Sequence, residues 1–165
     1  MPYQTQFGSI SSYRKGTIEL IDDKAKHYVF SNIFEVASRA KPFEKVVVAK
    51  NIQFVIEALR SEGESPWFAA SHDEFVICMD GATSVELIKL DAPETVVPAG
   101  TEGSVRLSGD PKGRRMGVIA LKRGHQAMLP VGAAYRFRSD AVGVLLLQTI
   151  LGRESVQKWS DICYQ

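Results

Sequence analysis

A carboxylate and an imidazole stand two positions apart in this sequence, at Glu74 and His72. If this segment is a strand, both side chains lie on one face, and together they would be the beginning of a metal site. His125 could add a ligand, so a self-sufficient metal-dependent enzyme with an atypical His72/Glu74/His125 site is one interpretation. The interpretation we favour is a chance distribution of three histidines, the third being His27, in 165 residues.

Other reactive side chains give no recognisable catalytic arrangement. Cys78 lies in the apolar run 75–79 and is expected to be a small buried hydrophobic residue, and Cys163 has no basic neighbour that would favour its thiolate. The loop 109–115 is rich in Gly and Arg but lacks the spacing of a P-loop. We therefore predict no catalytic residue in this chain.

The composition argues against several classes of partner. The chain has 20 Lys and Arg against 19 Asp and Glu, a net charge of +1, so nothing electrostatic points to nucleic acid. The apolar run 141–147 is far shorter than the roughly 20 residues of a membrane span. The sequence does not start with a basic end followed by an apolar stretch, as a secretory signal would. We expect a cytoplasmic protein without membrane association.

The middle of the sequence predicts β-structure. From about residue 45 to about 151, β-branched runs alternate with Gly, Pro and Asp, and no helical stretch separates them. This pattern predicts an all-β antiparallel sandwich or barrel, because a parallel sheet would need crossover helices. Asp80 and Gly81 predict a hairpin turn. The predicted strands cover residues 46–48, 54–56, 75–79, 85–90, 96–97, 105–107, 118–121, 135–138 and 142–150.

A short helix is predicted before this β-region, over about residues 31–41. Ile33, Phe34 and Ala37 fall on one helical face, and Ser31 is a suitable N-cap. The apolar face of such a helix must pack on the sheet of this domain or on another chain.

A second helix is predicted at the end of the chain, over about residues 154–163. Val156, Trp159 and Ile162 are spaced three apart on one face. An amphipathic terminal helix with a Trp needs an apolar surface on which to dock.

Two stretches resemble the paired motifs of the cupin superfamily, whose members fold as jelly-roll barrels. The first motif ends with Glu, six residues and Gly, and Glu74 and Gly81 fit this half. The second begins with Gly, five residues and Pro-x-Gly, and Gly124, Pro130 and Gly132 fit it without a gap. The resemblance implies a single cupin domain over residues 1–165, with short helices at both ends.

The first motif lacks its two histidines. A four-residue spacer before Glu74 puts the histidine positions at Trp67 and Ala69, and a three-residue spacer puts them at Phe68 and Ala70. Neither choice supplies a metal ligand.

The second motif has Tyr135 where the cupin histidine would stand, which leaves Glu74 alone of the standard ligands. Because an iron centre needs about three protein donors, we expect no metal in this barrel. Trp67, if it points inward, would fill the space of the ion. Glu74 and Tyr135 either point inward, with the phenol donating to the carboxylate because a buried carboxylate needs a partner, or both line the rim of a pocket.

Three segments, 27–36, 65–75 and the tail through Trp159, carry a further resemblance. They are similar to the small (alpha) subunit of the two-component hydroquinone 1,2-dioxygenases, which is a degenerate cupin. The resemblance implies a larger catalytic cupin subunit that binds Fe(II) and opens the aromatic ring with O₂. It also implies a heterotetramer of two small and two large chains, in which the small chain has no cofactor.

The candidate contacts with such a partner are Ile33 and Phe34 in the first helix and Trp159 in the last. A stand-alone cupin that binds a small phenol is a further alternative, because Trp67 and Tyr135, among other aromatic residues, could line an apolar pocket.

Overall fold

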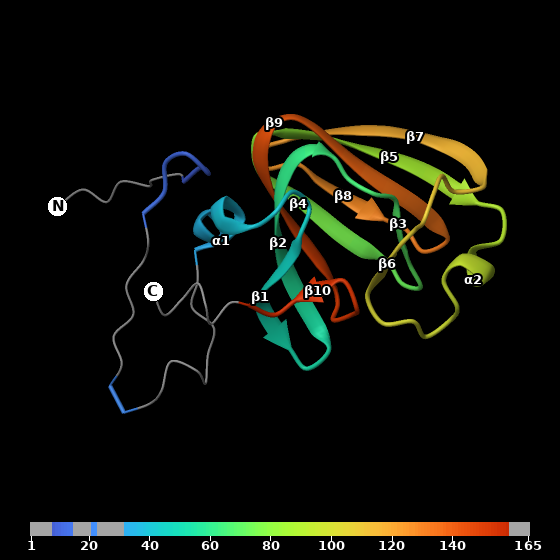
Figure 1. The fold of residues 1–165 in the computed structure, drawn as a ribbon, viewed down its shortest axis with the longest axis horizontal. Coiled ribbons are helices and arrows are strands. Elements are labelled where there is room, and N and C mark those ends of the chain that lie inside the picture. Colours follow the sequence, from blue (N-terminus) through green and yellow to red (C-terminus); the bar gives the residue numbers. More distant parts are fainter. Residues whose placement is uncertain (1–7, 15–20, 23–31, 159–165) are drawn as a thin grey trace.

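A curled antiparallel sheet dominates the structure, a computed structural model that describes residues 8–14, 21–22 and 32–158 (Figure 1). The all-β fold class is therefore confirmed. In chain order the elements are α1 (Ile33–Arg39), β1 (Lys45–Asn51), β2 (Phe54–Glu64), β3 (Phe68–Ala70), β4 (Glu74–Asp80), β5 (Ala82–Leu90), α2 (Pro93–Val96), β6 (Ser104–Arg106), β7 (Gly113–Lys122), β8 (Gln126–Leu129), β9 (Ala133–Ile150) and β10 (Ser155–Val156).

The 18-residue strand β9 organises the sheet. Its second half lies between β2 and β4, and its first half lies between β5 and β3. These pairings are antiparallel, and β7 and β8 extend the sheet from β5 and β4. Because β9 pairs with other strands on both of its edges, the sheet curls around an apolar interior.

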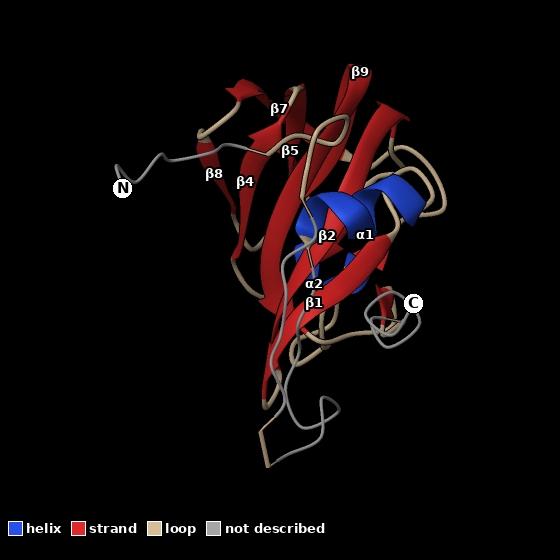
Figure 2. Ribbon diagram, turned by 90° about the vertical axis from the view of Figure 1, so that its left-hand side faces the viewer, coloured by secondary structure: helices blue, strands red, loops and turns tan. Residues whose placement is uncertain are grey.

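The interior of the barrel holds the largest apolar cluster, and two smaller clusters lie outside it. The inner cluster comprises Phe43, Leu59, Phe68, Val76, Cys78, Val85, Leu87, Leu121, Ala127, Leu129, Tyr135, Phe137, Leu145 and Leu147. One outer cluster lies beneath α1, which crosses β1 and β2 (Figure 2). The other contains Val97, next to α2, together with Trp67, Ala69, Leu90 and Ala134. None of the helices in the described part of the chain has the length and apolar character of a membrane span.

The predicted hairpin at Asp80 and Gly81 is wrong. The strands β4 and β5 do not pair with each other, and both pair with β9 in succession, so Gly81 is a bend between two consecutive strands. Gly81 has a φ of +74°, but Asp80 is not among the residues with positive φ, whereas a type I′ turn needs both. A Cβ at Gly81 would lie 3.1 Å from the Cα of Gly143, so the bend also depends on the close approach of β9.

The predicted strand at 96–97 is also wrong, because the short helix α2 spans Pro93–Val96. Proline at its first position fixes φ in the helical range and has no N–H that the helix would need. Two short strands, β3 and β8, were not predicted, because their few residues give no period to read.

The first helix is confirmed, but its cap is Asn32, and Ser31 lies outside the described residues. The Asn32 side chain accepts hydrogen bonds from the backbone N–H groups of Phe34 at 3.0 Å and Glu35 at 3.3 Å. Ile33 and Phe34 are half-buried, whereas Val36 and Ala37 are fully buried.

The predicted helix over 154–163 is wrong where the structure describes it. Ser155 and Val156 form β10, which pairs in parallel with Lys45 and Val46 of β1. A turn closed by the Ser155 N–H and the Gly152 carbonyl at 3.2 Å leads into this strand, and a β-branched Val suits it. Trp159 and Ile162 lie outside the described residues.

Candidate functional site

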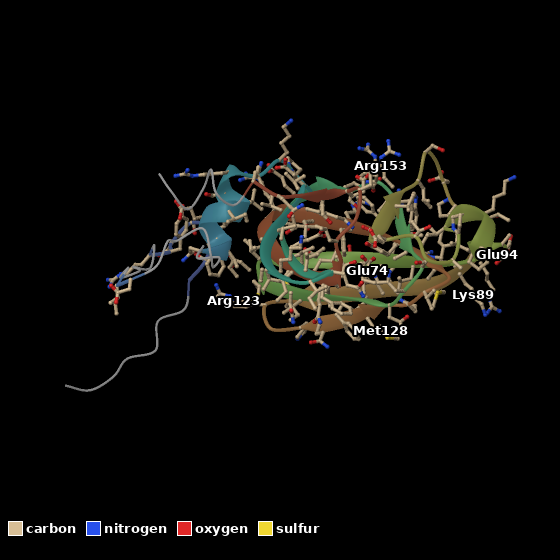
Figure 3. The ribbon with its side chains drawn as sticks, turned by 90° about the horizontal axis from the view of Figure 1, so that it is seen from below. Glu74, Lys89, Glu94, Arg123, Met128 and Arg153 are labelled. Atoms are coloured by element: carbon tan, nitrogen blue, oxygen red, sulfur yellow. The ribbon has the colours of Figure 1, made fainter. Side chains whose placement is uncertain are left out.

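The predicted contact between Glu74 and Tyr135 is present inside the barrel. Glu74 begins β4, Tyr135 belongs to β9, and their side chains are 0% and 2% exposed. The Tyr135 hydroxyl donates to Glu74 Oε2 at 2.6 Å, and the Thr149 hydroxyl donates to Oε1 at 2.6 Å. Figure 3 shows Glu74 between the strands, whereas the labelled Lys89, Glu94 and Arg153 lie at the outside. Both oxygens of the buried carboxylate are therefore hydrogen-bonded.

Lys45, at the start of β1, completes this network. Its side chain is only 2% exposed, and Nζ donates to Tyr135 Oη at 3.1 Å and to Ser104 Oγ. The ammonium also lies 4.1 Å from the ring centroid of Phe68, a cation–π distance. Sequence reasoning missed Lys45, because a lysine directly before a β-branched run reads as the polar end of a strand.

The three-residue spacer puts the two histidine positions of the first motif at Phe68 and Ala70. These positions, and not Trp67 and Ala69, lie on the face of β3 towards Tyr135. Phe68 belongs to the inner cluster, and its ring centroid lies 5.9 Å from that of Tyr135. Ala70 is on the same face of β3, because side chains alternate along a strand. We call the four positions Phe68, Ala70, Glu74 and Tyr135 the seat.

Trp67 and Ala69 are on the other face of β3, in the outer cluster beside α2. The Trp67 Nε1 donates to Asp110 Oδ1 at 3.0 Å, and the Arg136 guanidinium lies 4.5 Å from the ring centroid of Trp67. The expectation that the Trp67 indole fills the space of a metal ion is therefore wrong. The structure brings together Glu74 and Tyr135 of the predicted site, but not Trp67 and Ala69.

The histidines do not form a metal site in the described part of the chain. His72 Nε2 lies 3.0 Å from Thr149 Oγ1, and because that hydroxyl donates to Glu74, the imidazole N–H must donate to it. His125 is in the turn after β7, where its Nδ1 accepts from the Lys122 N–H at 3.2 Å. His27 lies outside the described residues. Among the described residues, no three His, Cys, Asp or Glu side chains gather as metal ligands would.

A second buried carboxylate, Glu57 of β2, faces the same interior and was not predicted. Its side chain is 1% exposed, and Oε1 accepts from the Ser155 hydroxyl at 2.5 Å, while Oε2 has no partner in the structure. Burial raises the pKa of Glu57 to about 7, although the Lys45 charge and the Ser155 hydrogen bond oppose the increase.

Electrostatics also fix the protonation of Tyr135. Burial, together with the charge of Glu74, raises the pKa of this phenol well above its ordinary value. Tyr135 therefore remains a hydrogen-bond donor to Glu74 and an acceptor from Lys45.

The donor set of the seat differs from an iron site. Non-haem iron sites typically take two imidazoles and a carboxylate, whereas the seat offers one carboxylate and a protonated phenol beside an ammonium group. The residues present do not fit an iron ion.

The curled barrel that holds Glu74 and Tyr135 defines the class of fold, which is that of a cupin. A cupin-2 protein from Shewanella frigidimarina NCIMB 400 has this fold, with a TM-score of 0.51 and 15% identity over 78% of this chain and all of that chain.

Two closer structures identify the family. The hydroquinone 1,2-dioxygenase of Sphingomonas sp. TTNP3, with 4-hydroxybenzoate bound, has a chain 51% identical over 98% of both chains, with a TM-score of 0.93. The hydroquinone 1,2-dioxygenase PnpCD, in complex with Cd²⁺ and 4-hydroxybenzonitrile, has one 52% identical over 99% of this chain and 98% of that one, with a TM-score of 0.92. The chain belongs to the family of small subunits of hydroquinone 1,2-dioxygenases.

Structures of these two enzymes also contain a longer chain with the same fold. The protein described here spans only 38% of the longer chain in the Sphingomonas enzyme and 42% of the longer chain in PnpCD in complex with Fe³⁺. The identities are 12% and 13% and the TM-scores 0.61 and 0.59, which show a shared fold. No protein-family model and no curated protein sequence matches this chain.

Proposed function

We propose that this chain is the non-catalytic small subunit of an Fe(II)-dependent hydroquinone 1,2-dioxygenase. A larger cupin subunit would bind the iron and the phenol and cleave the ring with O₂. The observation that carries the proposal is the seat, where Glu74 is bound by Tyr135 and Lys45 lies against Phe68 and Tyr135.

The physical argument against iron in this chain has two parts. Glu74 is the only strong ligand in the seat, and one carboxylate cannot hold the ion against water. The Lys45 ammonium adds a positive charge at the seat, and this charge repels a divalent cation in a buried environment of low dielectric constant.

The contribution of the chain to the enzyme would be structural. Permanent hetero-complexes commonly bury ~2,000 Å² or more, with an apolar centre. We propose that Ile33 and Phe34 of α1, and Trp159 in the tail, contact the larger chain. The half-buried Phe34 already packs against the N-terminal segment, where a Cβ at Gly8 would lie 2.7 Å from its ring, so part of its surface is used within the chain. The assembly would be a heterotetramer of two small and two large chains.

The test is to express the two chains separately and together, and to measure assembly, iron content and ring cleavage of hydroquinone. We expect iron in the larger chain only, and activity only when both chains are present. Stoichiometric iron or ring cleavage in the isolated small chain would instead make it a self-sufficient metal enzyme. Tight hydroquinone binding by the isolated small chain, without assembly, would favour a stand-alone binding cupin.

A further inference from the structure

We propose that the Lys45 ammonium is the resident cation of the seat, where it supplies the positive charge that a metal ion supplies in a metal-binding cupin. This inference rests on the proposed function, because it assumes that the seat holds no metal. It assigns a role to a residue outside both cupin motifs.

The position of the ammonium supports this role. Lys45 Nζ contacts Phe68 at one histidine position of the first motif and Tyr135 at the histidine position of the second. Through the Tyr135 hydroxyl it connects to Glu74, the ligand position that is retained. One cationic group therefore contacts residues of both motifs, as a bound ion would.

Each N–H donor of the Lys45 ammonium has a partner. A lysine ammonium has three N–H donors. Here they meet the Ser104 hydroxyl, the Tyr135 hydroxyl and the face of the Phe68 ring. This shell replaces the water that Lys45 loses on burial.

Two carboxyl groups also share the interior with Lys45. Lys45 is the only basic side chain in the buried set of the described residues, and the inner carboxylates of Glu57 and Glu74 face the same interior. Removing one partner of a buried pair leaves an uncompensated charge, which costs far more than removing both. Lys45 and Glu74 should therefore be energetically coupled, although a tyrosine stands between them.

The test is a double-mutant cycle in the full chain, with Lys45→Met, Glu74→Gln and the double variant. Each single substitution should raise the unfolding equilibrium constant about a hundredfold or more. The double variant should be at least about tenfold more stable than the product of the single effects predicts. Lys89→Met, which removes an exposed lysine from β5, is the matched control and should change the constant by less than about threefold.

Independent single effects, or a double variant that is unfolded while a single variant is folded, would overturn the proposal. A measurement on the unmodified chain covers the case in which no variant folds. A buried, hydrogen-bonded ammonium exchanges its hydrogens slowly, so ¹⁵N NMR at neutral pH should show one protected lysine NH₃⁺ resonance. Its absence would overturn the proposal.

The failure of this inference is distinguishable from that of the proposed function. Iron in the isolated small chain would refute the proposed function. Additive effects in a chain that is free of iron and assembles with its partner would refute only the role of Lys45.

Discussion

Replacing Tyr135 by Phe removes a single hydroxyl from the centre of the barrel and leaves the ring in place. That hydroxyl donates to Glu74 at 2.6 Å and accepts from Lys45 at 3.1 Å, and all three side chains are at most 2% exposed. Hydrogen bonds to buried charged groups contribute about 1.5–3 kcal/mol each. We expect Tyr135→Phe to lower the free energy of unfolding by about 3 kcal/mol, because both charges lose a partner that water cannot replace.

Urea unfolding followed by tryptophan fluorescence measures this change, and calorimetry should show a Tm lower by roughly 6–12 °C. Tyr13→Phe is the matched control, since the Tyr13 hydroxyl is 3.4 Å from Ser38 Oγ in a half-exposed position. It should change the free energy by less than about 0.5 kcal/mol. If Tyr135→Phe is as stable as the control, the hydroxyl does not hold the two charges and the account of the seat is refuted.

Three other substitutions or measurements test separate parts of the structure. Burial raises the pKa of Glu57 from 4.5 to about 7, so the folded chain binds this proton more tightly than the unfolded chain, and the stabilisation is full below pH 4.5 and is lost as pH rises through 7. Urea titrations at pH 5 and pH 8 should differ by about 2.5 kcal/mol from this group, and Glu57→Gln should remove that difference. Asn32→Ala should cost about 1 kcal/mol in urea unfolding because α1 loses its cap, and an unchanged value would contradict the capping geometry. Burial raises the pKa of the Cys78 thiol, so peptide mapping after iodoacetamide treatment of the folded chain at pH 8 should find Cys78 unmodified until urea is added; rapid modification would show that it is accessible.

The sequence predicted those parts of the fold that depend on local pattern. Alternation of β-branched runs with turn residues identified most strands, and the motif spacing identified Glu74 and Tyr135 as partners. The register of the first motif was ambiguous, because the spacer between a strand and Glu74 can have three or four residues. Only the packing of β3 on β9 shows that Phe68, and not Trp67, faces the interior.

The remaining residues of the site come from segments distant in sequence, which local patterns cannot connect. Lys45 and Glu57 are 29 and 17 residues before Glu74, and each reads locally as an ordinary polar residue in or beside a strand. The tail was misread because a three-residue apolar spacing fits a helix, while the edge of β1 offers Ser155 and Val156 a strand partner. Tertiary pairing decides such short segments.

The most direct test of the central claim is an iron-edge anomalous diffraction experiment on crystals of the assembled two-chain enzyme, grown with Fe(II). The account predicts anomalous density in the larger chain and none beside Glu74, where the Lys45 ammonium should lie against Phe68 and Tyr135. Iron bound to Glu74, with the Lys45 side chain displaced, would contradict it.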